Sequence, residues 1–166
     1  MRRGVAFTGV PSEEELAESP GYPSLAALER GPLAVIECVQ QIPCNPCETV
    51  CPTHAITVGE PITNLPRLDT SKCTGCGLCI PICPGQAIFR LDLTHSATEA
   101  ALSFPYEFLP MPRKGDRVVA VDREGLPVCG ASVLRVVMPP AYDKTAVVTI
   151  SIPKEHAMRV RSIQRI

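Results

Sequence analysis

The sequence predicts an α+β chain in which a cysteine-rich domain with an internal repeat is followed by a small all-β domain shaped like a barrel. Three observations lead to this prediction. Eight of the nine cysteines fall between residues 38 and 83. Part of the spacing between these cysteines occurs twice along the chain, so that Cys44 in the first copy corresponds to Cys76 in the second. After residue 112, short apolar runs alternate with turn residues, a pattern typical of β-strands.

Composition narrows the classes of function. The 166 residues carry a formal net charge of −1, which gives no overall attraction to nucleic acid or to an anionic membrane. No apolar run approaches the roughly 20 residues of a bilayer span. Arg2 and Arg3 precede no hydrophobic stretch of signal length, so we expect no export signal. Clustered cysteines indicate metal ligation more than disulfides, and a reducing, cytoplasmic location is expected.

Residues 1–32 are expected to form an N-terminal docking arm. Ser12 followed by Glu15 predicts a capping box that begins a short helix through about Ala17. A second helical turn is expected over residues 24–30, where Gly31 and Pro32 end it. Such an arm could lie on a partner subunit or pack on its own chain, and the sequence favours neither alternative.

The repeat lies within a domain predicted over residues 33–92. Its matching positions are Cys44, Cys47, Cys51 and Pro52 in the first copy and Cys76, Cys79, Cys83 and Pro84 in the second. Gln41 falls at the place of Cys73. Strands are plausible at 33–39 and 87–93. Two copies of one unit predict a pseudo-twofold domain, in which each copy supplies a strand, a ligand loop and a helical turn.

The second copy has the spacing C-x2-C-x2-C-x3-C-P over residues 73–84. This spacing wraps a loop around a 4Fe–4S cube and directs the fourth cysteine to a neighbouring cluster. Gly75 and Gly77 allow the backbone to approach the sulfurs and donate N–H groups to them. Zinc sites usually leave a longer gap between their cysteine pairs, so the spacing favours an iron–sulfur cluster.

Residues 34–92 resemble the bacterial-type, ferredoxin-like domain with two 4Fe–4S clusters. The resemblance implies that each cluster takes three cysteines from its own run and one from the other run. The implied ligands of cluster two are Cys73, Cys76, Cys79 and Cys51. Cluster one would take Cys44, Cys47 and Cys83, and one of its irons then lacks a ligand because Gln41 replaces the family cysteine.

Three alternatives exist for that iron. Cys38 could bind it, completing cluster one as Cys38, Cys44, Cys47 and Cys83. Cluster one could instead be a 3Fe–4S cluster, with Cys38 a buried thiol. Gln41 or a partner could also supply an unusual ligand. We favour Cys38, because an apolar strand delivers it to the end of the loop and two prolines stiffen the rest of the run.

The remaining chain is expected to hold a linker, residues 93–112, and a β-rich domain, residues 113–166. Strands are predicted over 117–122, 133–138 and 145–152, and a short helix is expected after Pro153. Cys129 is interpreted as a small buried hydrophobic residue. His54, His95 and His156 have no ligand spacing among them and are interpreted as structural or surface residues.

No nucleotide-binding fingerprint or catalytic triad pattern is present in the sequence, so we expect a non-catalytic chain. Basic residues occur at 113–117, but acidic residues accompany them and no aromatic residues interleave to stack bases, so no nucleic-acid partner is expected. The arm and the long C-terminal part are more than a free carrier needs, and additional elements on a redox module usually dock it.

Three stretches together resemble the small iron–sulfur subunits of multi-subunit, FAD-dependent amino-acid dehydrogenases of the proline and hydroxyproline type. They are residues 35–52, residues 73–84 and the tail 144–163. The resemblance implies FAD-containing partner subunits in a hetero-oligomer, between which this chain conducts single electrons. The alternatives are a free soluble ferredoxin-type carrier and a zinc-dependent nucleic-acid module.

Overall fold

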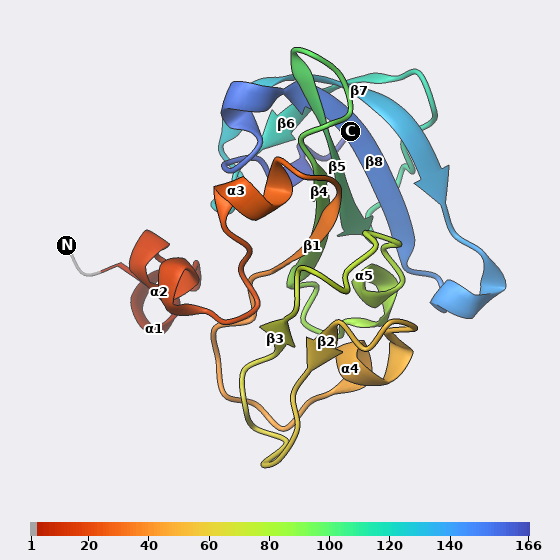
Figure 1. The fold of residues 1–166 in the computed structure, drawn as a ribbon. Helices are drawn as coiled ribbons and strands as arrows, with labels where there is room; N and C mark the ends of the chain where they lie inside the picture. The colour runs from red at the N-terminus through yellow and green to blue at the C-terminus, as the bar shows by residue number, and fades with distance from the viewer. Residues whose placement is uncertain (1–2) are drawn as a thin grey trace.

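The computed structural model describes residues 3–166. Figure 1 shows a cysteine-rich part below one end of a large sheet, with the N-terminal helices projecting to one side. Arg2, half of the arginine pair considered as an export signal, lies outside the described residues. None of the helices in residues 3–166 has the length and apolar character that a bilayer crossing needs.

The arm contains three short helices, α1 (Val5–Thr8), α2 (Glu13–Glu18) and α3 (Leu25–Leu28). The predicted capping box begins α2: the Ser12 backbone N–H donates to Glu15 Oε2 at 2.8 Å, and the Glu15 N–H donates to Ser12 Oγ at 3.2 Å. Glu15 Oε2 also accepts from the Val5 N–H at 3.1 Å, which ties α1 to α2. The helical turn expected over 24–30 is α3.

The cysteine-rich part follows the predicted repeat. It contains β1 (Leu33–Ile36), α4 (Pro46–Val50), β2 (Ile56–Thr57), β3 (Arg67–Leu68), α5 (Cys79–Ile82) and β4 (Ile88–Asp92). Strand β1 pairs antiparallel with β4 and places Ile36 opposite Ile88. Strand β3 pairs antiparallel with β2 and places Leu68 opposite Ile56, and the repeat offset relates Leu68 to Ile36 and Ile56 to Ile88. The two strand pairs are therefore copies of one unit.

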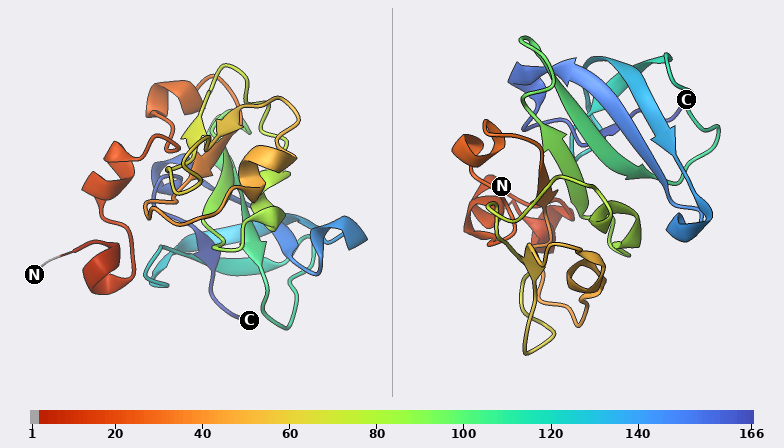
Figure 2. Two further views of the ribbon diagram at one scale, coloured as in Figure 1. Left: turned by 90° about the horizontal axis from the view of Figure 1, so that it is seen from below. Right: turned by 45° about the vertical axis from the view of Figure 1, so that its right-hand side comes forward.

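The rest of the chain contributes β5 (Glu99–Tyr106), β6 (Arg117–Val121), β7 (Pro127–Val137), β8 (Ala146–Pro153) and β9 (Ser162–Ile163), with 3-10 turns η1 (Pro140–Tyr142) and η2 (Lys154–His156). These strands join β1 and β4 in one seven-stranded antiparallel sheet of order β1-β4-β5-β8-β7-β6-β9. The right-hand view of Figure 2 shows this sheet as a curved layer above the cysteine-rich part.

The expected barrel is wrong, because the sheet is open. Its edge strands β1 and β9 lie at opposite ends of the strand order. The C-terminal strands do not close into a barrel of their own, because β5 pairs with β4 of the cysteine-rich part along one edge and with β8 along the other. The short helix expected after Pro153 is present as a 3-10 helix and not as an α-helix. The chain makes only the 3-10 turn η2 and then returns to pair β9 with β6.

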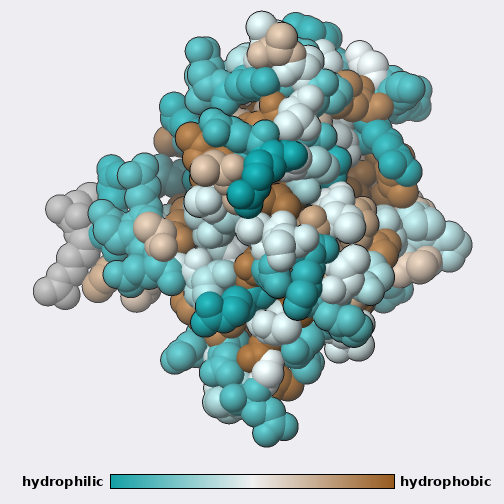
Figure 3. Space-filling model, in the orientation of Figure 1, coloured by the Kyte–Doolittle hydropathy of each residue, from teal (hydrophilic) through white to brown (hydrophobic). Residues whose placement is uncertain are grey.

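Residues 93–112, expected to be a linker, contain β5, an inner strand of the sheet. Its side chains alternate, and Ala100, Leu102, Phe104 and Tyr106 are all buried. They form one hydrophobic core with α3, β7 and β8. A second core, under α4 and α5, contains Ile36, Ile56, Ile80 and Ile88. On the face drawn in Figure 3, hydrophobic residues are exposed only in small separate patches among polar ones.

Candidate iron–sulfur site

The two cysteine loops have matching backbones. The His54 N–H donates to the Cys51 carbonyl at 3.2 Å, and the Gln86 N–H donates to the Cys83 carbonyl at 3.1 Å. His54 and Gln86 both have a φ of 51°, an uncommon value for residues other than glycine. Each loop therefore turns in the same way after its fourth cysteine.

Backbone hydrogen bonds also link the two copies. The Glu37 N–H donates to the Ala87 carbonyl, and the Asp69 N–H donates to the Ala55 carbonyl, both at 2.8 Å. The repeat offset relates Glu37 to Asp69 and Ala55 to Ala87, so these two bonds are equivalent. The strand end of each copy is thus hydrogen-bonded to the backbone of the other copy. These bonds bring cysteines that are distant in the sequence close together.

The first group of thiols contains Cys51, Cys73, Cys76 and Cys79. Burial raises the pKa of the Cys79 thiol to about 12, and the charges of the neighbouring Cys73, Cys76 and Cys51 contribute to the rise. All four line one small cavity of about 20 Å³. A thiol with such a pKa keeps its proton at neutral pH, so metal binding must release that proton.

Hydrogen-bond donors surround two sulfurs of this group. The Ala34 N–H donates to Cys73 Sγ at 3.5 Å, and the Ala55 N–H donates to Cys51 Sγ at 3.2 Å. Burial acts to raise the pKa of Cys51, but hydrogen bonds from the Ile56, Ala55 and Thr53 backbone and from the Thr53 hydroxyl outweigh it, so the pKa is lowered. A pocket of thiols with amide donors fits a thiolate-bound cluster, because those donors offset its negative charge.

Gly75 allows this loop to approach the sheet closely. Its φ is 63°, and a Cβ on it would lie 2.5 Å from the Pro32 carbonyl oxygen. Its own carbonyl accepts a hydrogen bond from Arg90 Nε at 2.6 Å. The close approach and the positive φ both require glycine at this position.

The second group of thiols contains Cys38, Cys44, Cys47 and Cys83. Burial raises the pKa of Cys47 to about 11, and Cys83, Cys44 and Cys38 contribute to the rise through their charges. Burial also raises the pKa of Cys38, followed by the charges of Cys83 and Cys44. Cys38 thus lies among the other three thiols and is half-buried, whereas Gln41 is exposed.

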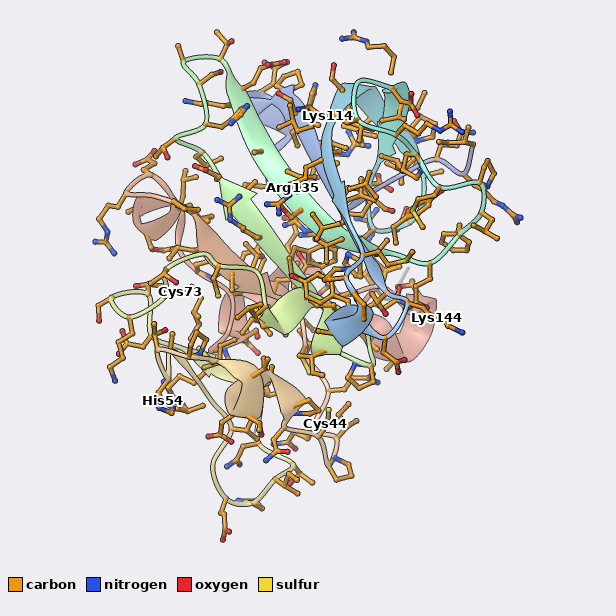
Figure 4. All side chains as sticks on the ribbon, turned by 90° about the vertical axis from the view of Figure 1, so that its right-hand side faces the viewer. Cys44, His54, Cys73, Lys114, Arg135 and Lys144 are labelled. Carbon is orange, nitrogen blue, oxygen red and sulfur yellow. The ribbon has the colours of Figure 1, made fainter. Side chains whose placement is uncertain are left out.

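The cysteines of both groups together number eight, and each thiol of a 4Fe–4S site binds its own iron. Within residues 3–166, no three Cys, His, Asp or Glu side chains converge on the position of a single metal ion. Figure 4 shows Cys73 and Cys44 in different loops of the cysteine-rich part. Cys129 lies elsewhere, on β7, where burial and then the charge of Glu155 raise its pKa.

A buried ionic network next to Cys38 was missed in the sequence. The Glu37 carboxylate accepts from Arg123 Nε at 2.8 Å, from Arg123 Nη2 at 2.6 Å and from Arg161 Nε at 2.6 Å. The Arg161 guanidinium also lies 5.5 Å from the centre of the Phe89 ring. These partners are 86 and 124 residues apart in sequence, so no local pattern could have indicated them.

Comparison with known proteins agrees with this geometry. The family model of the LdpA Fe-S cluster-binding domain matches residues 38–94. Residues 38–94 are a ferredoxin-like, 4Fe–4S cluster-binding domain. The ferredoxin-like domain ends at β4, and the remaining strands of the sheet lie beyond it. No solved structure matches the chain.

Curated relatives match less than a third of this chain. One subunit of an ion-translocating oxidoreductase complex from Methanosarcina acetivorans is 49% identical over 47 residues, which are 28% of this chain and 17% of that protein. One subunit of a Na+-translocating ferredoxin:NAD+ oxidoreductase complex from Acetobacterium woodii is 50% identical over 38 residues, 23% of this chain and 11% of that protein. A polyferredoxin-like subunit of an aliphatic sulfonate oxidoreductase from Pyrococcus furiosus is 43% identical over 49 residues, 30% and 27% respectively.

The matched part thus spans less than a third of each of these relatives. None of the three is an amino-acid dehydrogenase subunit by its name. The matches therefore cover a short segment of this chain and leave its partners open.

Proposed function

We propose that this chain is the electron-transfer subunit of a multi-subunit, FAD-dependent amino-acid dehydrogenase of the proline or hydroxyproline type. It would carry single electrons between flavin centres in FAD-containing partner subunits. The observation that carries the proposal is the pair of four-thiol groups inside a domain that matches 4Fe–4S proteins. The sequence resemblance of residues 35–52, 73–84 and 144–163 supports the type of partner.

The proposed ligands divide by thiol group. Cluster one is assigned to Cys38, Cys44, Cys47 and Cys83, and cluster two to Cys51, Cys73, Cys76 and Cys79. The pKa values of Cys47 and Cys79 support this division, because each is raised in part by the charges of the other three thiols in its own group. Thiolate is also a far softer ligand than the amide of Gln41, which favours Cys38.

When bound, each 4Fe–4S cluster accepts and releases one electron. Hydrogen-bond donors of the chain would stabilise the negative charge that the added electron brings. The N–H groups of Ala34 and Ala55 donate to cysteine sulfurs, and hydrogen bonds to sulfur help to set cluster potentials. Cys47 and Cys79 are buried, so the protein keeps water from the inner side of each site.

The remaining elements are proposed to dock the 4Fe–4S domain in its complex. Helix α1 contributes no buried side chain, and Figure 1 shows α1 and α2 projecting from the body. The sheet beyond β4 adds five further strands, β5 to β9, that a cluster-binding module alone does not use. A projecting arm and an added sheet are consistent with a subunit more than with a free carrier.

The test is anaerobic affinity purification of the tagged chain from its native source, with an untagged culture as control. We expect a brown complex that contains a flavoprotein, releases FAD on denaturation and oxidises proline or hydroxyproline. Iron and sulfide analysis of the isolated chain should give about eight irons, because two 4Fe–4S clusters are expected.

The second candidate is a free ferredoxin-type carrier, which would need only the cluster-binding domain of residues 38–94. A brown, flavin-free monomer from the same purification would support this carrier and refute the subunit. A flavoprotein partner that oxidises no amino acid would leave electron transfer intact and refute the type of dehydrogenase.

A further inference from the structure

Arg90 lies on β4 at the place where the sheet meets the loop of cluster two. Its neighbours across the sheet are Ala34 on β1 and Ser103 on β5. Arg90 Nε donates to the Gly75 carbonyl at 2.6 Å, so the guanidinium holds the loop that carries three of the four thiols. The side chain is 24% exposed, and its charge is therefore largely removed from water.

Arg90 contacts both the loop and the cavity of the cluster-two thiols, and its counterion does not line that cavity. Arg90 lines the cavity that contains the four thiols of cluster two. It also lines an outer hollow of about 400 Å³ on the open face of the sheet. Asp92 Oδ2 lies 3.4 Å from Arg90 Nη2 and lines only the outer hollow. Arg90 thus borders the cavity that contains all four thiols, whereas Asp92 shares a hollow with only one of them, Cys76.

The equivalent position of the other repeat has no charge. The repeat offset places Val58 where Arg90 stands, and Val58 is a buried apolar side chain. The two arginines near cluster one, Arg123 and Arg161, both bind the Glu37 carboxylate. The two clusters therefore have different electrostatic surroundings although their ligands are of one kind.

We propose that Arg90 is a positioning residue that raises the reduction potential of cluster two selectively. Reduction adds one electron to the cluster, which passes from a 2+ to a 1+ core, and no bond forms or breaks. A fixed guanidinium beside a site of low polarity stabilises the added negative charge. Net charge and hydrogen bonding around a cluster are known means of setting its potential. The inference rests on the ligands that the proposed function assigns to cluster two.

The experiment is an anaerobic redox titration of the cluster-loaded full chain, followed by electron paramagnetic resonance and visible absorbance. Two midpoint potentials are expected in wild type. The one that Cys38→Ser changes belongs to cluster one, and the other belongs to cluster two. In Arg90→Gln, we expect the ratio of reduced to oxidised cluster two to fall about tenfold at a fixed solution potential, a 59 mV decrease for one electron.

The matched control is Arg135→Gln. Arg135 is exposed on the same face of the sheet and lines the same outer hollow, but it does not line the thiol cavity. Arg135→Gln removes the same charge as Arg90→Gln. Neither midpoint potential should change by as much as a third of the change expected in Arg90→Gln. Arg90→Lys keeps the charge and should recover at least half of the shift, which a purely steric role would not predict.

Asp92→Asn tests the inference from the opposite direction. It removes the counterion and keeps a side-chain oxygen for the Thr94 N–H, which donates to Asp92 Oδ1 at 3.0 Å. We expect the midpoint of cluster two to rise. If Arg90→Gln loses iron, the sign of the Asp92→Asn shift decides, and an unchanged or lower midpoint overturns the inference. Wild type with fewer than about eight irons would instead refute the ligand assignment of the proposed function.

Discussion

Glu37 is the residue whose substitution tests how the sheet supports the cysteine-rich part. It follows β1 and directly precedes Cys38, and only 7% of its surface is exposed. Three charge-assisted hydrogen bonds of 2.6–2.8 Å join its carboxylate to Arg123 and Arg161. Glu37→Gln keeps the shape and removes the charge, so two buried guanidinium groups lose their counterion.

The expected loss of stability is about 3 kcal/mol. Removing one partner of a buried ion pair typically costs about 3–5 kcal/mol, because the other charge stays buried. The lower end applies here, since 18% of the Arg123 side chain is exposed and the amide oxygen of Gln can still accept one bond. With a urea slope of about 2 kcal/mol per M, the unfolding midpoint falls by about 1.5 M.

The assay is urea unfolding of the cluster-loaded protein without oxygen, followed by far-ultraviolet circular dichroism and cluster absorbance. Glu107→Gln is the control, because Glu107 is exposed and, within residues 3–166, accepts a hydrogen bond only from the Thr145 hydroxyl, at 2.7 Å. It should change stability by less than about 0.5 kcal/mol, or about 0.25 M. If Glu37→Gln shifts the midpoint no further than this control, the buried network does not stabilise the fold.

The pH dependence has a definite sign. Burial acts to raise the pKa of Glu37, but the hydrogen bonds and charges of Arg123 and Arg161 outweigh it, so the pKa is lowered on folding. The stability that Glu37 contributes is therefore fully present above its unfolded pKa of about 4.3. It is lost as the pH falls through the lower folded value. The difference between wild type and Glu37→Gln should be constant above about pH 5.5 and shrink below about pH 4.3.

Three further outcomes are expected. Cys38→Ser should remove cluster one or convert it to a 3Fe–4S form, measured by iron content and electron paramagnetic resonance, whereas Gln41→Ala should keep about eight irons; equal iron in both variants would contradict the assignment of Cys38. Gly75→Ala should destabilise the protein by about 2 kcal/mol or more, because alanine is strained at φ 63° and its Cβ would meet Pro32. Gly85→Ala has open space and should unfold at nearly the wild-type urea concentration, and equal midpoints for the two glycine variants would oppose this reasoning. The isolated, flavin-free chain should not oxidise any amino acid with an artificial electron acceptor, and measurable turnover would overturn the non-catalytic assignment.

The sequence predicted the local features of the site well. The cysteine spacing of residues 73–84 indicates a cluster because a short loop can reach only one cube. The capping box at Ser12 predicted where α2 begins, since it depends on residues three positions apart. The repeat offset predicted two equivalent units, and the equal φ values of His54 and Gln86 agree with it.

Tertiary structure decided where Cys38 lies. The sequence placed it shortly before Cys44 and left three alternatives for the fourth iron. Strand β1 pairs with β4, and this pairing brings the end of β1 to the side of the domain where Cys83 lies. The thiol of Cys83, far along the chain from Cys38, becomes its neighbour only through that pairing, which spacing in the sequence cannot reveal.

The open sheet was likewise decided by contacts between distant segments. Residues 93–112 were expected to be a linker, where the structure has β5. Strand β5 is buried because β4 and β8 cover both of its edges and the core covers one face. The sequence by itself determined the ligand loops, whose chemistry is local. Only the fold decided that the strands after them extend the same sheet and place Arg90, Arg123 and Arg161 beside the cysteines, because those contacts depend on the path of the whole chain.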